Sequence, residues 1–249
     1  MSEFIVHFYK VRYEMKKESD RILKRSVLSG LVAAALYTSQ VMAFTDPVDS
    51  GSTVEHELVE NGTQNVYGET NNITVGENGE QNVYSGGITN DTVLKDGGVQ
   101  YVYDRGTANG TILQKGAGAS GIIQNVYDGG TANNTIINEG GMQYVSNKGT
   151  ATGATIKDGG GQIVWSGGTA TGTTIENGGL MQNAGEDSST TVKDGGVYEL
   201  GRNNVGSTDS PYYLYYGTAR ASDLTVEAGG RAEVYAGTLT GATVSGANA

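Results

Sequence analysis

The chain has 249 residues, of which 40 are glycine, two are proline and none is cysteine, and its formal net charge is −11. This composition does not suit a helical or ordinary α/β domain, yet a hydrophobic content of 37% is too high for a flexible linker. The absence of cysteine excludes disulfides and thiolate metal sites. Composition therefore indicates a glycine-rich fold with a thin core.

The first 43 residues differ in kind from the rest. Basic residues precede an apolar run over 27–37, and Val41-Met42-Ala43 has the small residues that a signal peptidase prefers. The run is too short to span a membrane, although a buried amphipathic helix is an alternative interpretation. We expect a secretory signal peptide over 1–43, with Met15 as an alternative start.

Removal of this segment would make the chain more acidic. It takes away seven of 16 basic and four of 27 acidic residues, which leaves nine against 23 and a net charge of −14. No basic patch remains, so the sequence predicts no nucleic-acid partner and no membrane contact beyond the signal peptide.

A repeated unit begins near Asn61, after a lead-in or cap over 44–60, and continues to the end of the chain. Gln81 and Gln100 lie nineteen residues apart, as do Gln143 and Gln162, while Gln124 follows Gln100 by twenty-four because of an insertion. Self-similarity at a fixed period of this length is typical of solenoids.

Each unit reads roughly GG-x-Q-x-V-Y-x-GGTA-x-x-T-x-I-x-D. Two short β-like segments are separated by Gly, Asn and Asp, which tolerate positive φ at corners. Nineteen residues leave no room for a helix, but they fit one coil of a parallel β-helix with coils ~4.8 Å apart. The sequence predicts an all-β, single-stranded parallel β-helix of about nine coils over 61–249.

Three columns of the repeat are expected to point inward. The first contains Val66, Val83, Val102, Val126, Val145 and Val164. The second contains Val75, Leu94, Leu113, Ile137, Ile156, Ile175, Val192, Val226 and Val244. The third, expected at a corner that needs a small residue, contains Ala108, Ala132, Ala151 and Ala170.

A glutamine column precedes the valines by two positions, so period-two alternation places it on the same side. Buried amides one coil apart can bond to each other, which favours an internal ladder over a solvent-facing row. The ladder contains Gln64, Gln81, Gln100, Gln124, Gln143 and Gln162. The variable column between them, Asn65, Asn82, Tyr101, Asn125, Tyr144 and Ile163, is expected to face solvent.

An aromatic column alternates outward by the same logic. It contains Tyr67, Tyr84, Tyr103, Tyr127, Trp165 and Tyr235. Such a row could bind a sugar or another rod, but stacking of neighbouring rings on one another is the favoured interpretation.

The pattern breaks in two places. The unit at 178–194 is short and loses the Gln-x-Val-Tyr spacing, and the next one carries an insertion near 203–217. Insertions in solenoids map to protruding loops, so the tyrosines of this one are candidates for partner contact: Tyr212, Tyr213, Tyr215 and Tyr216. A hairpin folded over the rod is the alternative.

The sequence offers no catalytic, cofactor or metal site. His7 and His56 are the only histidines, and no phosphate loop or Gly-x-Ser-x-Gly elbow occurs. Acidic residues before the glycine pairs recur in coil after coil, as turn residues do. We predict neither an enzyme nor a cofactor.

Gln100-Tyr-Val-Tyr-Asp-Arg-Gly-Thr-Ala and the similar run from Gln162 resemble the nineteen-residue repeat of AIDA-type autotransporters, antigen 43 among them. The resemblance covers about 61–244. It implies a right-handed β-helix passenger on a Gram-negative surface, which mediates autoaggregation, biofilm formation or adhesion through like molecules on neighbouring cells or host-surface receptors. It also implies use of no cofactor.

Such proteins end in a membrane β-barrel that is not recognisable in this sequence, so we expect a truncated product or fragment of a longer one. With a barrel the passenger would reach the outer membrane and cell surface, and without one the periplasm. The alternatives are a carbohydrate-active or carbohydrate-binding β-helix, and a binding module that uses the tyrosine insertion.

Overall fold

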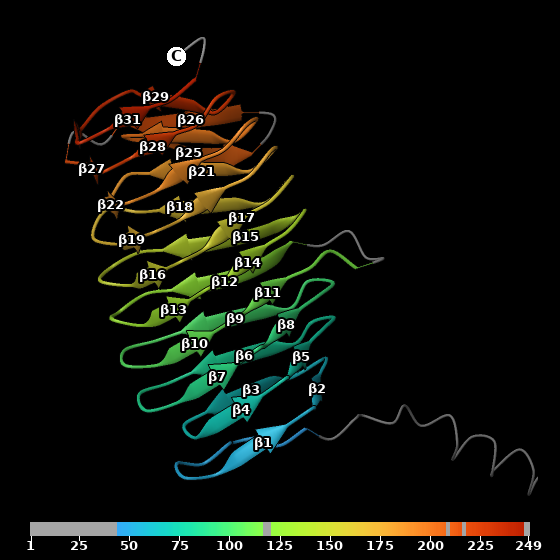
Figure 1. Cartoon of the computed structure of the whole chain (residues 1–249). Helices are drawn as coiled ribbons and strands as arrows, with labels where there is room; N and C mark the ends of the chain where they lie inside the picture. The colour runs from blue at the N-terminus through green and yellow to red at the C-terminus, as the bar shows by residue number, and fades with distance from the viewer. Residues whose placement is uncertain (1–43, 117–120, 208–209, 216–217, 247–249) are drawn as a thin grey trace, which may run out of the picture. The chain divides into compact units, whose positions relative to one another are not determined.

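The computed structural model describes residues 44–116, 121–207, 210–215 and 218–246, and the side chains of 203–217 lie outside this description. The described chain contains strands and turns but no helix, and it winds into a stack of coils (Figure 1). Each coil contributes one short strand to each of three parallel sheets, which we call sheets A, B and C.

Sheet A contains β3 (Thr63–Val66), β6 (Glu80–Val83), β9 (Val99–Val102), β12 (Ile122–Val126), β15 (Gly141–Val145), β18 (Gly161–Val164), β21 (Leu180–Asn183), β24 (Val197–Leu200) and β29 (Arg231–Val234). Sheet B contains β1 (Thr53–Glu55), β4 (Glu69–Asn71), β7 (Ile88–Asn90), β10 (Thr107–Asn109), β13 (Thr131–Asn133), β16 (Thr150–Thr152), β19 (Thr169–Thr171), β22 (Glu186–Ser188), β27 (Arg220–Ser222) and β30 (Thr238–Thr240).

Sheet C contains β2 (Leu58–Val59), β5 (Thr74–Val75), β8 (Val93–Leu94), β11 (Ile112–Leu113), β14 (Ile136–Ile137), β17 (Thr155–Ile156), β20 (Thr174–Ile175), β23 (Thr191–Val192), β28 (Thr225–Val226) and β31 (Thr243–Val244). A separate antiparallel hairpin joins β25 (Arg202–Ser207) to β26 (Ser210–Tyr215).

The parallel β-helix expected from the repeat is confirmed, with nine strands in sheet A and hence about nine turns. Each coil has three strands rather than two segments, because the second segment bends between sheets B and C. Residues with positive φ make this bend, among them Asn72, Asp91 and Gly153. Asn, Asp and Gly reach this conformation at the lowest steric cost.

The second glycine of each pair lets adjacent coils approach closely at the corner between sheets A and B. A Cβ atom on Gly130 would lie 2.2 Å from the carbonyl oxygen of Val102 in the preceding coil, and one on Gly168 would lie 2.4 Å from that of Val145. Any side chain there would force the coils apart, which explains why the pair recurs.

The stack begins earlier than the sequence pattern indicated. The segment 44–60 supplies β1 and β2, which pair in register with β4 and β5. Val48 bridges to Val66 and is fully buried. The segment 44–60 therefore forms part of the β-helix. It was not recognised in the sequence because it lacks the Gln-x-Val spacing of the later coils.

The interior holds the expected columns. The six valines of the first column are fully buried, and so is the second column from Val75 to Val192. Val226 is 5% exposed and Val244 is 57% exposed, since no described coil covers it.

The alanine column also lies inside, but its expected position at a corner was wrong. Ala108, Ala132 and Ala151 occupy the middle of sheet B strands and point into the core. A small residue suits this position because it lies close to the glutamines of sheet A: in the two preceding coils the same position holds Thr70 and Thr89, which accept hydrogen bonds from Gln81 (3.4 Å) and Gln100 (3.2 Å).

The variable column between the glutamines and valines was expected to face solvent, and this is only partly right. Its members lie on the outer face of sheet A, but Ile163 and Asn82 are 8% and 5% exposed, and Tyr101 and Tyr144 are half-buried. Side chains only ~4.8 Å apart on successive strands cover one another, which removes much of their surface from water.

Candidate functional site

A hydrogen-bonded row of glutamine side chains runs through the core along sheet A. Gln81 donates from Nε2 to Gln64 Oε1 (2.9 Å), and Gln100 does the same to Gln81 (2.8 Å). The row continues from Gln124, Gln143 and Gln162, each donating to the preceding glutamine, at 2.8, 2.7 and 2.6 Å. All six side chains are fully buried.

Threonines from the bend between sheets B and C complete the bonding of this row. Thr111 donates to Gln100 Oε1 and Thr135 to Gln124 Oε1, both at 3.1 Å. Thr173 donates to Gln162 Oε1 at the last glutamine. At the first, Gln64 Nε2 donates to Glu57 Oε2 (3.1 Å) and to the Thr45 carbonyl. The supporting threonines were not anticipated, although each follows a glutamine by eleven residues.

The outer face of sheet B carries two regular rows of polar side chains. One contains Thr107, Thr131, Thr150 and Thr169, which pair in register. The other begins with a surface amide ladder, in which Asn90, Asn109 and Asn133 each donate to the preceding asparagine at 2.9 Å. Between β10 and β19 this face therefore offers a hydroxyl group from the first row in every coil.

The aromatic row stands at the corner between sheets A and B, directly after the sheet A strands. The rings of Tyr67 and Tyr84 stack at 5.0 Å, and those of Tyr84 and Tyr103 at 4.9 Å. Tyr127 meets Tyr103 edge-on at 5.0 Å. Partial burial raises the pKa of Tyr84 and Tyr127 above the usual tyrosine value. The expected stacking of neighbouring rings is therefore found from Tyr67 to Tyr103, whereas Tyr127 packs edge-on and Tyr235 lies against Arg202.

The regular core ends at the short unit 178–194. Met181 and then Tyr198 follow Gln162 in register, and Asp187 follows Ala170. The Asp187 side chain therefore points into the core, where Thr190 Oγ1 donates to its Oδ1 at 2.8 Å. Burial raises the pKa of the Asp187 carboxyl to about 6, although the bond from Thr190 opposes this shift.

Asn183 and Tyr198 lie in the same buried polar cluster as Asp187. Asn183 donates to the Tyr198 hydroxyl at 3.1 Å and to the Arg220 carbonyl at 2.8 Å. Both side chains are fully buried. The sequence signal for this cluster was Asp187, which stands in the column that the four preceding coils fill with alanine.

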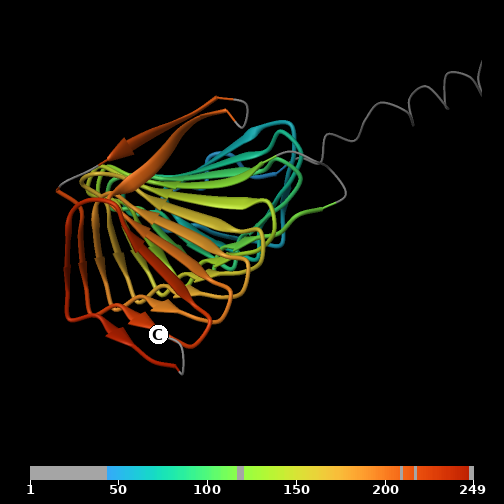
Figure 2. The same cartoon turned by 90° about the horizontal axis from the view of Figure 1, so that it is seen from above.

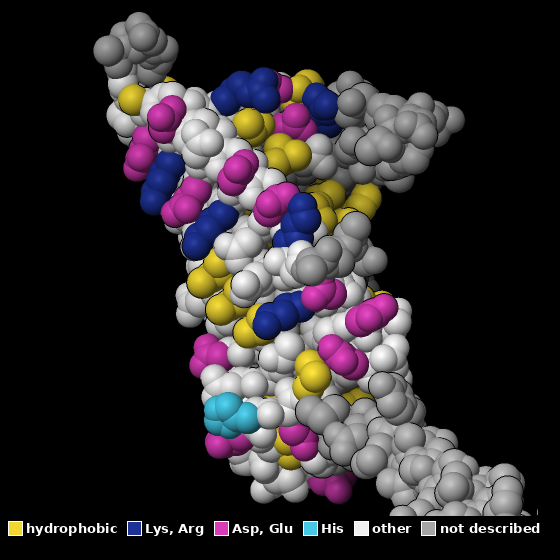
Figure 3. Space-filling model, turned by 90° about the vertical axis from the view of Figure 1, so that its right-hand side faces the viewer, with side chains coloured by type: hydrophobic (Ala, Val, Ile, Leu, Met, Phe, Trp, Pro, Cys, Tyr) yellow, Lys and Arg dark blue, Asp and Glu magenta, His cyan; other side chains and the backbone are white. Residues whose placement is uncertain are grey.

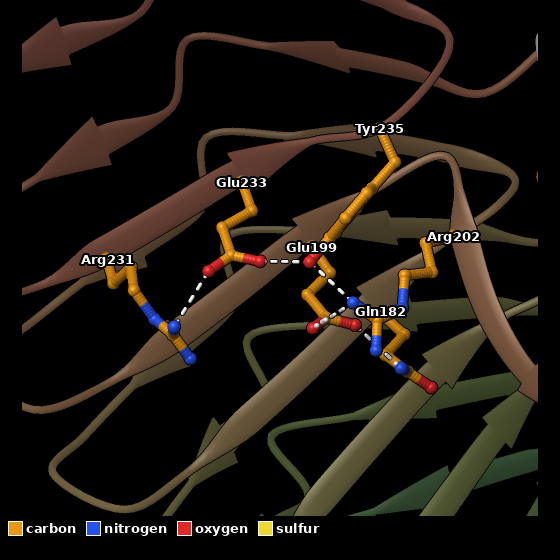
Figure 4. A network of polar contacts seen from close by, with 6 residues as sticks. All are labelled: Gln182, Glu199, Arg202, Arg231, Glu233 and Tyr235. Atoms are coloured by element: carbon orange, nitrogen blue, oxygen red, sulfur yellow. Dashed lines mark hydrogen bonds and ion pairs between the residues drawn. The ribbon is translucent and has the colours of Figure 1, made fainter. Parts of the chain in front are cut away.

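A charged network covers the outer face of sheet A beside this cluster (Figure 4). Gln182 donates to Glu199 Oε2 at 2.7 Å, and Arg202 lies 3.5 Å from Glu199 Oε1 and 4.6 Å from the Tyr235 ring centroid. Tyr235 in turn donates to Glu233. The network fixes Arg202, the first residue of the hairpin.

The hairpin is the part of the insertion that the structure describes. Figure 2 shows it running along the outside of the coils, and β25 contacts β21 of sheet A. The candidate contact residues Tyr212, Tyr213, Tyr215 and Tyr216 have side chains outside the described part. Their role remains a prediction.

Opposite charges alternate along the upper part of the face seen in Figure 3, whereas its lower part carries acidic side chains and one histidine, because residues 44–94 contain no Lys or Arg. Lys115 pairs with Glu139, and Lys193 with Glu176. Among the described residues, no group of three or more His, Asp or Glu side chains is placed to hold a metal ion. Nor does that part of the chain contain a helix long and apolar enough to cross a membrane.

Comparisons with known proteins show which proteins have similar repeats. Residues 119–160 match the family described as adhesin of bacterial autotransporter system, probable stalk. Over 69 residues, 28% of this chain, the sequence is 55% identical to the probable autotransporter YpjA of Escherichia coli strain K12. The matched segment spans 4% of that relative's length.

A solved structure is also similar, that of a TibC-catalysed hyper-glycosylated TibA fragment. It is 28% identical with a TM-score of 0.47, over 80% of this chain and 86% of the other. The family match and the E. coli relative confirm the resemblance that the repeat indicated: the matched segments are similar to the stalk of a bacterial autotransporter adhesin and to a probable autotransporter.

Proposed function

We propose that this chain is a passenger segment of an autotransporter adhesin, exported to the bacterial surface, where it holds cells to one another or to host surfaces. The observation that carries the proposal is the periodic outer face of sheet B. Its threonine row recurs in four successive coils, from Thr107 to Thr169, and its asparagine row in four, from Asn71 to Asn133. Two such faces can therefore form many identical weak contacts, whose sum grows with the number of coils engaged.

The placement of the acidic residues argues against an enzyme. A glycosidase needs a pair of carboxyl groups that flanks its substrate, whereas the acidic residues before the glycine pairs recur at equivalent turn positions. Of the acidic residues on strands, Asp187 lies in the core, and the exposed Glu186 has Thr169 and Arg220 as its register neighbours rather than a second carboxyl group. We propose a non-enzymatic, structural role.

A settling assay tests the proposal. Residues 44–249 are displayed on a non-aggregating bacterium through a carrier translocator, with surface exposure measured by an epitope tag. We expect these cells to settle faster than cells with an empty carrier. Thr131→Lys with Thr150→Lys should slow settling, because like charges then face each other across the contact, while Thr174→Lys on sheet C should not. Equal settling of displaying and empty cells would refute self-association.

The hairpin is a second candidate for the contact, favoured by its four tyrosines and by its position outside the coils. Replacement of 203–217 by a short glycine linker tests it. Loss of settling with the thermal melt unchanged would assign adhesion to the hairpin. Full settling would exclude it.

A further inference from the structure

The outer face of sheet B changes character near its C-terminal end. Across four successive strands, β19, β22, β27 and β30, the surface forms an open hollow of about 290 Å³. Its lining includes Glu186, Arg220, Ser188, Ser222 and Thr238. This volume is at the lower end of the range for small-molecule sites, ~300–1,000 Å³, and suits a single sugar ring better than a long chain.

Two opposite charges stand side by side in this hollow without pairing. Glu186 and Arg220 are in register on neighbouring strands, and both side chains are exposed. Within the part of the chain that the structure describes, neither has an ion-pair partner within 4.0 Å. The guanidinium therefore keeps its donors available for an anion from outside.

Hydroxyl groups surround the two charges. Thr169 and Thr238 continue the row of Glu186 and Arg220, while Ser188 and Ser222 stand two residues further along their strands, about 7 Å away. Ser188 Oγ donates to Thr171 Oγ1 at 3.2 Å and keeps its acceptor lone pairs. The floor is formed by Asp187 and Ala221, whose side chains point inward.

We propose that this hollow binds a sugar acid, a pyranose with one carboxylate such as a uronic or sialic acid at the end of a glycan. Arg220 donates two parallel hydrogen bonds to the sugar carboxylate, the geometry in which guanidinium and carboxylate match best. Glu186 accepts hydrogen bonds from ring hydroxyls, and Ser188 and Ser222 exchange bonds with the remaining ones. The inference rests on the proposed adhesive function, because it names a ligand class for the displayed rod.

Competition from Glu186 does not prevent this binding. An exposed ion pair contributes only ~0–1 kcal/mol, so its transient formation in solution costs the ligand little. A neutral sugar would find the same hydroxyls but no partner for Arg220. Discrimination between acidic and neutral sugars is therefore the signature of the site.

The test uses the purified chain 44–249 in solution, with glucuronate, N-acetylneuraminate and glucose titrated separately and followed by nuclear magnetic resonance. We expect one or both acids to bind up to about fivefold more tightly than glucose, the fold-change that corresponds to the ~1 kcal/mol of an exposed ion pair. Arg220→Gln should abolish the preference. Arg231→Gln, which removes an arginine outside the hollow, should leave it unchanged.

Equal binding of acids and glucose, or a preference that survives Arg220→Gln, would overturn the proposal, as would no binding of either acid. Because Arg220 is exposed, an unchanged thermal melt of R220Q is expected and separates lost binding from lost folding. The titration needs no cells. Its failure is therefore distinguishable from a failure of the settling assay, and either can fail alone.

Discussion

Gln124 makes three hydrogen bonds inside the core: it donates to Gln100 and accepts from Gln143 and Thr135. Its replacement by methionine keeps the volume but removes all three. Thr135 is then left without its acceptor in a site that is 1% exposed. Because an unsatisfied buried polar group costs about 1–3 kcal/mol, we expect Gln124→Met to lower the free energy of unfolding by that amount.

Denaturant unfolding measures this loss, with Gln114→Met at an exposed position as the matched control. If Q124M proved as stable as Q114M, the ladder would contribute no stability and would serve only to fill space.

Asp187 makes stability depend on pH. Its folded-state pKa is about 6, above the 3.8 of an unperturbed carboxyl, so folding favours the protonated form. The stabilising contribution is complete below about pH 4 and is lost as pH rises through 6. The gap between these two pKa values corresponds to roughly 3 kcal/mol of folding free energy, because one pKa unit is worth ~1.4 kcal/mol.

Asp187→Asn removes this titration while retaining the shape. We expect the stability of D187N relative to the parent to rise by up to roughly 3 kcal/mol between pH 4 and pH 7.5. The control Asp194→Asn, at an exposed corner, should show the same change of stability with pH as the parent. A D187N profile parallel to that of the parent would show that the carboxyl is not buried as described.

Among the structural elements, the tyrosine corner is the clearest case of coupling between coils. Tyr84 stacks on the rings above and below it. A double-mutant cycle with Tyr84→Ala and Tyr103→Ala should give a coupling free energy of about 0.5–1.5 kcal/mol, as for other aromatic pairs. Additive effects of the two substitutions would mean that the rings stand beside each other without stabilising the stack.

The repeat predicted the elements well where one residue type occupies a column. Gln100 and Val102 are two residues apart on a strand, so the burial of one implied the burial of the other. The bend at Asn72 or Gly153 was harder to place, because a single residue with positive φ divides an apparently continuous segment into two strands. Spacing also placed Ala108 at a corner, since a small side chain suits both a corner and a position close to the buried glutamines.

The site was less predictable than the fold. Glu186 and Arg220 are 34 positions apart, with the hairpin insertion between them, and only the register of β22 with β27 brings them together. Once a loop of unknown length interrupts the period, the sequence no longer shows which residues become neighbours.

At the scale of the whole molecule, each coil depends on the coils above and below it. A single buried valine contributes only ~1.5–3 kcal/mol, too little to hold one coil by itself, so stability is shared among nearest neighbours. Val145 is fully buried near the middle of the stack. Val145→Asp places an unpaired carboxylate there, and we expect several adjacent coils to unfold together.

Amide hydrogen exchange across 44–246 tests this dependence most directly, with Thr152→Asp, exposed on the same coil, as the control. We predict that V145D loses protection in its own coil and in the one on either side, roughly 122–175, while T152D keeps the parent pattern. Protection lost in the mutated coil alone, or nowhere, would contradict the claim that the coils hold one another in place.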